Sequence, residues 1–110
     1  QIILSLVNDV DGDYNVTIEG NTEIDFDRKG NWFYIKNSKK QKFPESILQL
    51  LPNTLNKYIE KDYPEQYIRR IEKKSYGYRV KLNKPNNVEL TFSKTGEFLS
   101  IESKASDNLD

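Results

Sequence analysis

The sequence predicts an α+β domain: an antiparallel sheet built from two tandem helix-plus-four-strand units, with helix packed on one face. Three observations lead to this prediction. Apolar and polar residues alternate with a period of two in several short segments, tight turns separate these segments, and one central segment has helical spacing instead. The 110 residues suffice for a single domain, 1–110, with a modest core.

The first third of the chain is typical of an antiparallel meander. Segment 1–8 is apolar and β-branched, and in segment 14–19 Tyr14, Val16 and Ile18 fall on one face. Segments 22–27 and 32–36 complete a group of four strands. The turn between the last two contains Gly30, which is free to take a positive φ.

Segment 43–63 changes to helical spacing. Pro44 suits a first helical turn, and Pro52 indicates a short helix followed by a second helix or a kink. The strand pattern returns in 67–75, 76–82, 88–93 and 97–103. We expect a bulge in the first of these, because Ile68 and Ile71 are three residues apart. Segment 104–110 is a polar tail.

The two halves of the chain repeat one another. Identical residues stand 66 positions apart at four places: Glu23 and Glu89, Phe26 and Phe92, Gly30 and Gly96, Ile35 and Ile101. Upstream, with an offset of 64, "YNVTI" meets "YRVKL", and Leu4 and Val7 meet Ile68 and Ile71. We therefore predict two tandem units. Segment 1–36 holds strands only, its helix absent or upstream, and segment 43–103 holds a helix followed by four strands.

Several motifs then resemble a known family. They are "EIDFD" with "GNW" after it, "PESI", "YPEQYI", "YRVKL" and "LTFSKTG", in this order along the chain. The chain resembles the PepSY-like group, also called β-lactamase-inhibitor-protein-like, from about Leu4 to Glu102. The resemblance implies tandem α+β units that form one curved sheet with helices on one face. It also implies a small exported protein of Gram-negative bacteria, periplasmic or secreted, with its signal peptide removed and no assigned activity.

The resemblance does not imply β-lactamase inhibition, because no inhibitory contact residue can be matched to this chain. Composition excludes further classes. Lys+Arg and Asp+Glu are equal at 17 each, so the basic excess of a nucleic-acid binder is absent. The chain has neither His nor Cys, which removes the commonest general base, the commonest transition-metal ligand and thiolate chemistry. No apolar run approaches the roughly 18 residues that would span a membrane.

Two acidic patterns in the sequence are also better explained without metal binding or catalysis. Asp9, Asp11 and Asp13 recur every second residue, but the Gly and Glu positions of an EF-hand loop are not matched. Asp25 and Asp27 lie in a carboxylate row along one strand face, which does not supply the converging pair of a glycosidase. We therefore expect no catalytic residue, no metal and no cofactor.

The strand face opposite the helix holds polar residues that differ between the halves. They are Asn15, Thr17, Asp25 and Asp27 in the first unit and Arg79, Lys81, Thr91 and Ser93 in the second. This open face is predicted to be acidic in one half and basic in the other. It is either a binding surface or a solvated face, since antiparallel sheets often leave one face wet.

The segment "NWFYI" is apolar on both faces. Phe33 and Ile35 meet Leu99 and Ile101 in the repeat, which indicates a shared core role. Alternation then places Trp32 and Tyr34 on the open face, where rings supply contact area and a polar handle for a ligand. The alternative is that Trp32 packs under a loop or on the other unit. The candidate binding residues are Trp32, Tyr34, Phe98, Asp25, Asp27, Arg79 and Lys81.

The sequence thus predicts a non-enzymatic exported domain. One hypothesis is that it binds a protein or peptide, in the manner of an inhibitor, through the open sheet face or by adding a strand at a sheet edge. A second hypothesis is a small ligand or glycan on the face of Trp32, Tyr34 and Phe98. A third is a structural or assembly role in which another copy occupies the face.

Overall fold

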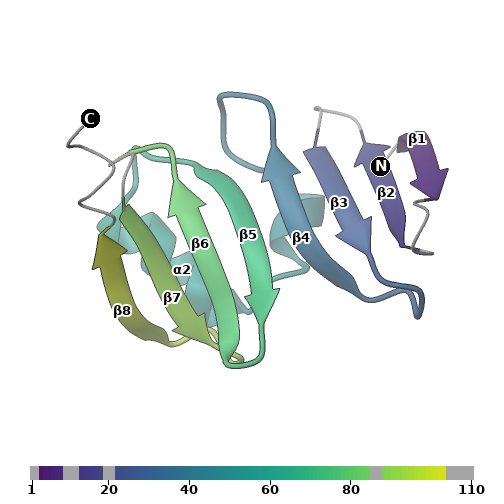
Figure 1. Cartoon of the computed structure of the whole chain (residues 1–110). Helices are drawn as coiled ribbons and strands as arrows, with labels where there is room; N and C mark the ends of the chain where they lie inside the picture. The colour runs from purple at the N-terminus through teal and green to yellow at the C-terminus, as the bar shows by residue number, and fades with distance from the viewer. Residues whose placement is uncertain (1–2, 9–12, 19–21, 85–87, 104–110) are drawn as a thin grey trace, which may run out of the picture.

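In the computed structural model, the described residues are 3–8, 13–18, 22–84 and 88–103. They form one antiparallel sheet in which each strand pairs with its neighbours in the sequence, in the order β1 to β8 (Figure 1). The strands are β1 (Ile3–Asn8), β2 (Tyr14–Ile18), β3 (Thr22–Phe26), β4 (Trp32–Asn37), β5 (Ile68–Lys74), β6 (Gly77–Leu82), β7 (Val88–Ser93) and β8 (Phe98–Ser103). The predicted α+β antiparallel sheet is confirmed. The predicted tail, 104–110, lies outside the described residues.

Two short helices separate β4 from β5, and a proline precedes each of them. They are α1 (Glu45–Leu48) and α2 (Asn53–Asp62). Proline has no N–H group, and at the start of a helix an N–H group would have no acceptor within the helix. The carbonyls of Pro44 and Pro52 accept the first helical hydrogen bonds. The predicted break at Pro52 is therefore confirmed. Figure 1 shows both helices on the same side of the sheet, with α2 crossing behind β6, β7 and β8.

The core lies between the helices and the apolar face of the sheet. Leu55, on α2, is fully buried, and Ile35, Ile71, Val80 and Phe92 are buried below it. The remaining buried apolar residues are Ile18, Ile24, Trp32, Phe43, Ile47, Leu51, Ile59, Ile68, Leu82 and Leu90. The predicted packing of the alternating strand face against the helix is confirmed.

Bulges interrupt the pairing at three places in the described strands after β2. In the β3–β4 pair, Asp25 faces Tyr34 but Phe26 faces Trp32, so Phe33 is an extra residue. In the β7–β8 pair, Leu99 is extra in the same way. In the β5–β6 pair, Arg69 is extra, which confirms the bulge predicted for this strand. Each extra residue reverses the faces on which the residues beyond it lie.

The bulges correct the prediction for the aromatic strand and its counterpart. Ile35 is fully buried as expected, but Phe33 is 37% exposed. Leu99 and Ile101 are 52% and 53% exposed, because β8 is an edge strand with β7 as its one neighbour in the sheet. The shared core role predicted for Phe33, Leu99 and Ile101 is therefore wrong.

Two glycines occupy equivalent hairpin turns with different surroundings. Gly30 has φ +90° and Gly96 has φ +92°. A Cβ on Gly30 would meet nothing within 4 Å. A Cβ on Gly96 would lie 2.7 Å from Cβ of Pro52 and 2.8 Å from the backbone nitrogen of Leu55. The β7–β8 turn therefore packs directly against the start of α2, and a side chain there would push the helix away.

The two glycines provide a matched pair of substitutions. Gly30→Ala should lower the free energy of unfolding by about 1–2 kcal/mol, the cost of a left-handed backbone for an L-residue. Gly96→Ala should cost at least about 1 kcal/mol more, because the added carbon overpacks the joint with α2. Urea unfolding followed by circular dichroism measures both. Equal losses in the two variants would contradict the tight joint.

Candidate functional site

Two rows of side chains cross the sheet face that neither helix covers. Residues paired directly across an antiparallel ladder point to the same face, so the register defines each row. One row is Asn15, Asp25, Tyr34, Glu72, Arg79, Thr91 and Ser100. The other is Thr17, Glu23, Lys36, Arg70, Lys81, Glu89 and Glu102. We call this surface the open face.

A cluster of charges around Glu89 is the most strongly held part of the open face. The side chain of Glu89 is only 3% exposed although no helix covers it. Its Oε2 accepts a hydrogen bond from Nη2 of Arg70 at 2.9 Å, and its Oε1 accepts one from Nε of Arg79. Arg79 also reaches Glu102, with Nη2 2.9 Å from Oε1. The two guanidinium groups thus stand in fixed positions on either side of one carboxylate.

The electrostatic state of Arg79 reflects this arrangement. Burial by itself lowers the pKa of the Arg79 guanidinium, because burial disfavours the charged form. Hydrogen bonds with Glu89, Tyr76 and Glu102, and the charge of Glu89, outweigh this and raise that pKa above its ordinary value. Arg79 therefore stays charged at every pH at which the protein is folded, and the cluster has a permanent cation at its centre.

The register also corrects the predicted distribution of charge. Lys36, Arg70 and Lys81 are neighbours across β4, β5 and β6, so the positive charges form a central strip. Glu23 lies on one side of this strip, and Glu89 with Glu102 lies on the other. The prediction of an acidic first half and a basic second half is therefore wrong. It placed Arg79 and Lys81 correctly but did not consider the acids of β7 and β8.

The two predicted aspartates have different positions. Oδ1 of Asp25 accepts a hydrogen bond from Nδ2 of Asn15 at 2.5 Å, within the row that the register defines. Asp27 lies beyond the end of β3, in the hairpin turn. Its Oδ1 accepts the backbone N–H groups of Lys29 and Asn31, each at 2.9 Å. These bonds, with that of Asn31 the strongest, hold the pKa of Asp27 below its ordinary value.

Trp32 does not lie on the open face, and that prediction is wrong. The bulge at Phe33 pairs Trp32 with Phe26, so the indole points to the helix-bearing face. Trp32 is 9% exposed and stacks on Tyr78 with ring centroids 6.0 Å apart. Nζ of Lys73 lies 4.3 Å from the centre of the indole ring, a cation–π contact.

Phe98 is also on the helix-bearing face. The bulge at Leu99 pairs Phe98 with Phe92, and the Phe98 ring stacks on Tyr58 of α2 at 4.8 Å. Tyr34, paired with Asp25 and Glu72, does lie on the open face. Trp32, Tyr34 and Phe98 are thus divided between two faces and do not form the single aromatic platform that the alternation predicted.

Sequence reasoning missed Glu89, Arg70 and Glu102 as parts of the site. A signal was present, because Glu89 is an outward residue in "VELTF", and the preceding strand carries Arg79 on the same predicted face. Among the described residues no group of three His, Cys, Asp or Glu side chains could hold a metal ion. Asp9 and Asp11 lie outside the described residues. Neither described helix has the length and apolar character needed to cross a membrane.

Comparison with known proteins places these features in context. The model of a family described as "Putative beta-lactamase-inhibitor-like, PepSY-like" matches residues 12–100. No curated protein matches the chain.

Solved structures from two Bacteroides species have a similar fold. A "putative calcium-regulated periplasmic protein" of Bacteroides thetaiotaomicron is 27% identical, with a TM-score of 0.67 over 93% of this chain and 78% of that one. Two proteins of Bacteroides vulgatus, each described as a "putative periplasmic protein", are 25% and 24% identical, with TM-scores of 0.64 and 0.66 over 93% of this chain. The match covers 78% of the 25% identical protein and 79% of the 24% identical protein. The 24% identical protein is described as of unknown function.

The position of Trp32 predicts its fluorescence. It is the single tryptophan of the chain, and it is buried against Tyr78 and Lys73. Its emission should be blue-shifted in the folded protein, and its quenching by acrylamide should be several-fold weaker than in urea. A red-shifted, fully quenched emission from the folded protein would show that the indole is exposed.

The Glu89 cluster predicts an unequal pair of stability effects. Glu89→Gln removes a buried carboxylate, leaves Arg70 without its anion and leaves Arg79 with Glu102 alone, so it should cost about 2–4 kcal/mol. Glu102→Gln is the matched control. Glu102 is half-exposed and contacts one arginine, so its loss should cost less than about 1 kcal/mol. Urea unfolding at low salt measures both, and equal effects would contradict a special role for Glu89.

Proposed function

The chain belongs to the β-lactamase-inhibitor-like, PepSY-like family, and we propose that it is a non-catalytic periplasmic protein that binds another protein or peptide on its open face. The observation that carries the proposal is Glu89, a carboxylate nearly removed from water on a sheet face that no helix covers. It fixes Arg70 and Arg79 before any partner arrives.

Fixed arginines are well suited to binding proteins. Arginine is enriched at the energetic centres of protein interfaces, and a guanidinium that is already held loses little conformational entropy on binding. The open face also presents Tyr34. Arginine and tyrosine together are the residue types that protein interfaces favour over lysine and glutamate.

The central positive strip defines the kind of partner. Lys36, Arg70 and Lys81 lie side by side across three strands. A partner segment that carries carboxylates would complement this strip, and the flanking Glu23 and Glu102 would repel it from any shifted register. The proposed partner is therefore a protein or peptide with an acidic stretch that lies across the strands.

The cellular location is part of the same proposal. The Bacteroides proteins with the same fold are described as periplasmic. A periplasmic binding protein that inhibits an enzyme there is one form of the proposed function. The hypothesis of a glycan platform has lost its structural basis, because Trp32 and Phe98 face the helix layer.

We also propose that the domain consists of two tandem units. The bulges at Phe33 and Leu99 occupy equivalent positions 66 residues apart. Gly30 and Gly96, also 66 apart, share nearly the same φ. These agreements support two units of common design, which would extend one polar face across both.

The edge strand β8 offers a second surface for the same function. Leu99 and Ile101 are more than half exposed on a strand with one free edge, which is a template for an added strand. Natural proteins usually protect such an edge with charge or proline. In β8, by contrast, the apolar side chains of Leu99 and Ile101 are exposed to solvent.

Photo-crosslinking tests the proposal. A photo-reactive phenylalanine replaces Tyr34 on the open face, or Leu50, which is exposed in the helix layer. Each variant is irradiated with a periplasmic extract of the source bacterium. The Tyr34 position should give an adduct of one discrete mass, and the Leu50 position should not. Lys36→Glu should weaken the adduct about 5–50-fold, because it reverses a charge in the strip.

Other outcomes would contradict the open face as the site. An adduct from both positions, or from neither, would remove the evidence for a specific partner there. An adduct from a photo-reactive phenylalanine at Ile101, without any adduct from Tyr34, would place binding at the β8 edge instead. An adduct of twice the chain mass of 12.9 kDa would mean that a second copy occupies the face.

A further inference from the structure

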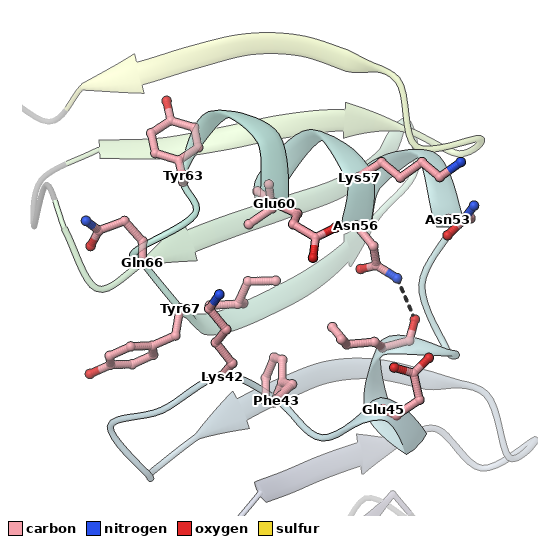
Figure 2. Close-up of a pocket in the computed structure, with 13 residues that line it drawn as sticks. Lys42, Phe43, Glu45, Asn53, Asn56, Lys57, Glu60, Tyr63, Gln66 and Tyr67 are labelled. Atoms are coloured by element: carbon pink, nitrogen blue, oxygen red, sulfur yellow. Dashed lines mark hydrogen bonds between the residues drawn. The ribbon is translucent and has the colours of Figure 1, made fainter.

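The helix layer contains a cavity that is separate from the open face. Its volume is about 270 Å³, and three segments enclose it: the end of the β4–α1 loop with α1, one side of α2, and the connection from α2 into β5 (Figure 2). This corresponds to about nine water molecules at the volume of liquid water. The cavity is therefore near the lower end of the size range of ligand sites and fits a small molecule.

One of the residues that line this cavity carries a buried hydrogen-bond acceptor without a donor. Nδ2 of Asn56 donates to the backbone carbonyl of Leu48 at 2.8 Å, which joins α2 to the end of α1. This bond fixes the orientation of the amide, because the reverse orientation would place two oxygens together. Oδ1 of Asn56 is then buried and has no donor among the described residues. A buried acceptor left in this state costs about 1–3 kcal/mol.

A carboxylate accompanies this acceptor. Glu60 follows Asn56 by one turn of α2, so the two side chains leave the same face of the helix. Figure 2 shows the Glu60 carboxylate beside the Asn56 amide. An acceptor oxygen next to a carboxylate is the combination that a ligand ammonium group requires, since each of its N–H groups needs an acceptor and its charge needs an anion.

The opposite side of the cavity has the complementary chemistry. Lys42 extends into it from the loop before α1 (Figure 2). Gln66 lies at the far end, and its Oε1 is a second buried atom without a partner among the described residues. Figure 2 shows its amide directed away from Lys42, so Lys42 is the group on this side that can pair with a ligand anion. Phe43, Ile59 and Ile68, all buried, form an apolar wall between the two sides.

We propose that this cavity binds a small zwitterion with an apolar side chain, the chemistry of a free branched-chain amino acid. The ligand ammonium pairs with the carboxylate of Glu60, and Oδ1 of Asn56 accepts a second N–H when the two side chains move apart to admit it. Its carboxylate pairs with Lys42. Its side chain packs on Phe43 and Ile59. The site is independent of the proposed partner on the open face, because it uses none of the same residues.

Titration of the ¹⁵N-labelled protein with L-leucine tests the site. Saturable shifts should be confined to residues 42–48, α2 and residues 63–68. Three related probes each lack one group: 4-methylpentanoate has no ammonium, 3-methylbutylamine has no carboxylate, and glycine has no side chain. Each should bind at least about 5-fold more weakly than leucine, the effect of losing about 1 kcal/mol of interaction.

Two charge variants and two matched controls locate the ligand. Glu60→Gln and Lys42→Gln should each weaken leucine binding about 5-fold or more. Glu65→Gln and Lys61→Gln change exposed residues that do not line the cavity. They should leave the affinity for leucine within about 2-fold of that of the unchanged protein. All four positions are exposed, so thermal unfolding should be nearly unchanged. The absence of shifts with leucine at tens of millimolar, or equal binding of 4-methylpentanoate, would overturn the proposal.

Discussion

One extra residue in β4 and one in β8 determine which aromatic rings enter the core. Side chains alternate strictly along a strand, so an unpaired residue transfers everything beyond it to the other face. At Phe33 the bulge sends Trp32 inward to stack on Tyr78. At Leu99 the equivalent bulge sends Phe98 onto Tyr58 of α2. The second contact joins α2 to the edge strand of the sheet.

The aromatic joint around α2 follows from the second bulge. Tyr58 contacts Phe92 edge-on at 5.4 Å and Phe98 face-on at 4.8 Å, the two geometries that aromatic pairs prefer. Gly96, in the turn between these strands, allows the backbone of α2 to approach closely. Burial of Tyr58, with the nearby charge of Asp62, raises the pKa of its hydroxyl, so the ring stays neutral over the working range of pH.

Because the rings turn inward, the open face is left to charged and polar groups. A buried carboxylate there is stable only if cations replace the water it has lost. Glu89 obtains two, from Arg70 on β5 and Arg79 on β6. The same pairing restrains both arginines in one geometry. A surface of this kind has high specificity for the shape and charge of what it contacts, whereas a solvated face would carry mobile, unpaired lysines.

Local patterns predicted most of the fold, and the errors have one physical origin. Alternation placed β2, β3, β6 and β7 with the correct face inward, and the prolines marked both helix starts. The predictions failed for Trp32 and Phe98, because a bulge leaves no mark in a run of residues that is apolar on both faces. In β5 the spacing of Ile68 and Ile71 did show the bulge, since polar residues lay between them.

The candidate sites were harder to predict because both depend on long-range pairing. Arg70, Arg79 and Glu89 come from three strands, and only the register brings them together. The cavity depends on how α1 packs against α2, which a sequence with two short helical segments does not specify. In the sequence, Asn56 cannot be distinguished from any other polar residue on an exposed helix. Only the structure shows its hydrogen bond to the carbonyl of Leu48.

The two surfaces meet at a single segment of β5. Ile68 forms part of the cavity wall, and Arg70, two residues later, holds Glu89 on the opposite face. The bulge at Arg69 lies between them and allows both side chains to take these positions. A change at Ile68 or Arg69 would therefore alter both surfaces at once. Glu60 lines only the cavity and Lys36 lies only on the open face, so substitutions at these residues can separate the function of the cavity from that of the open face.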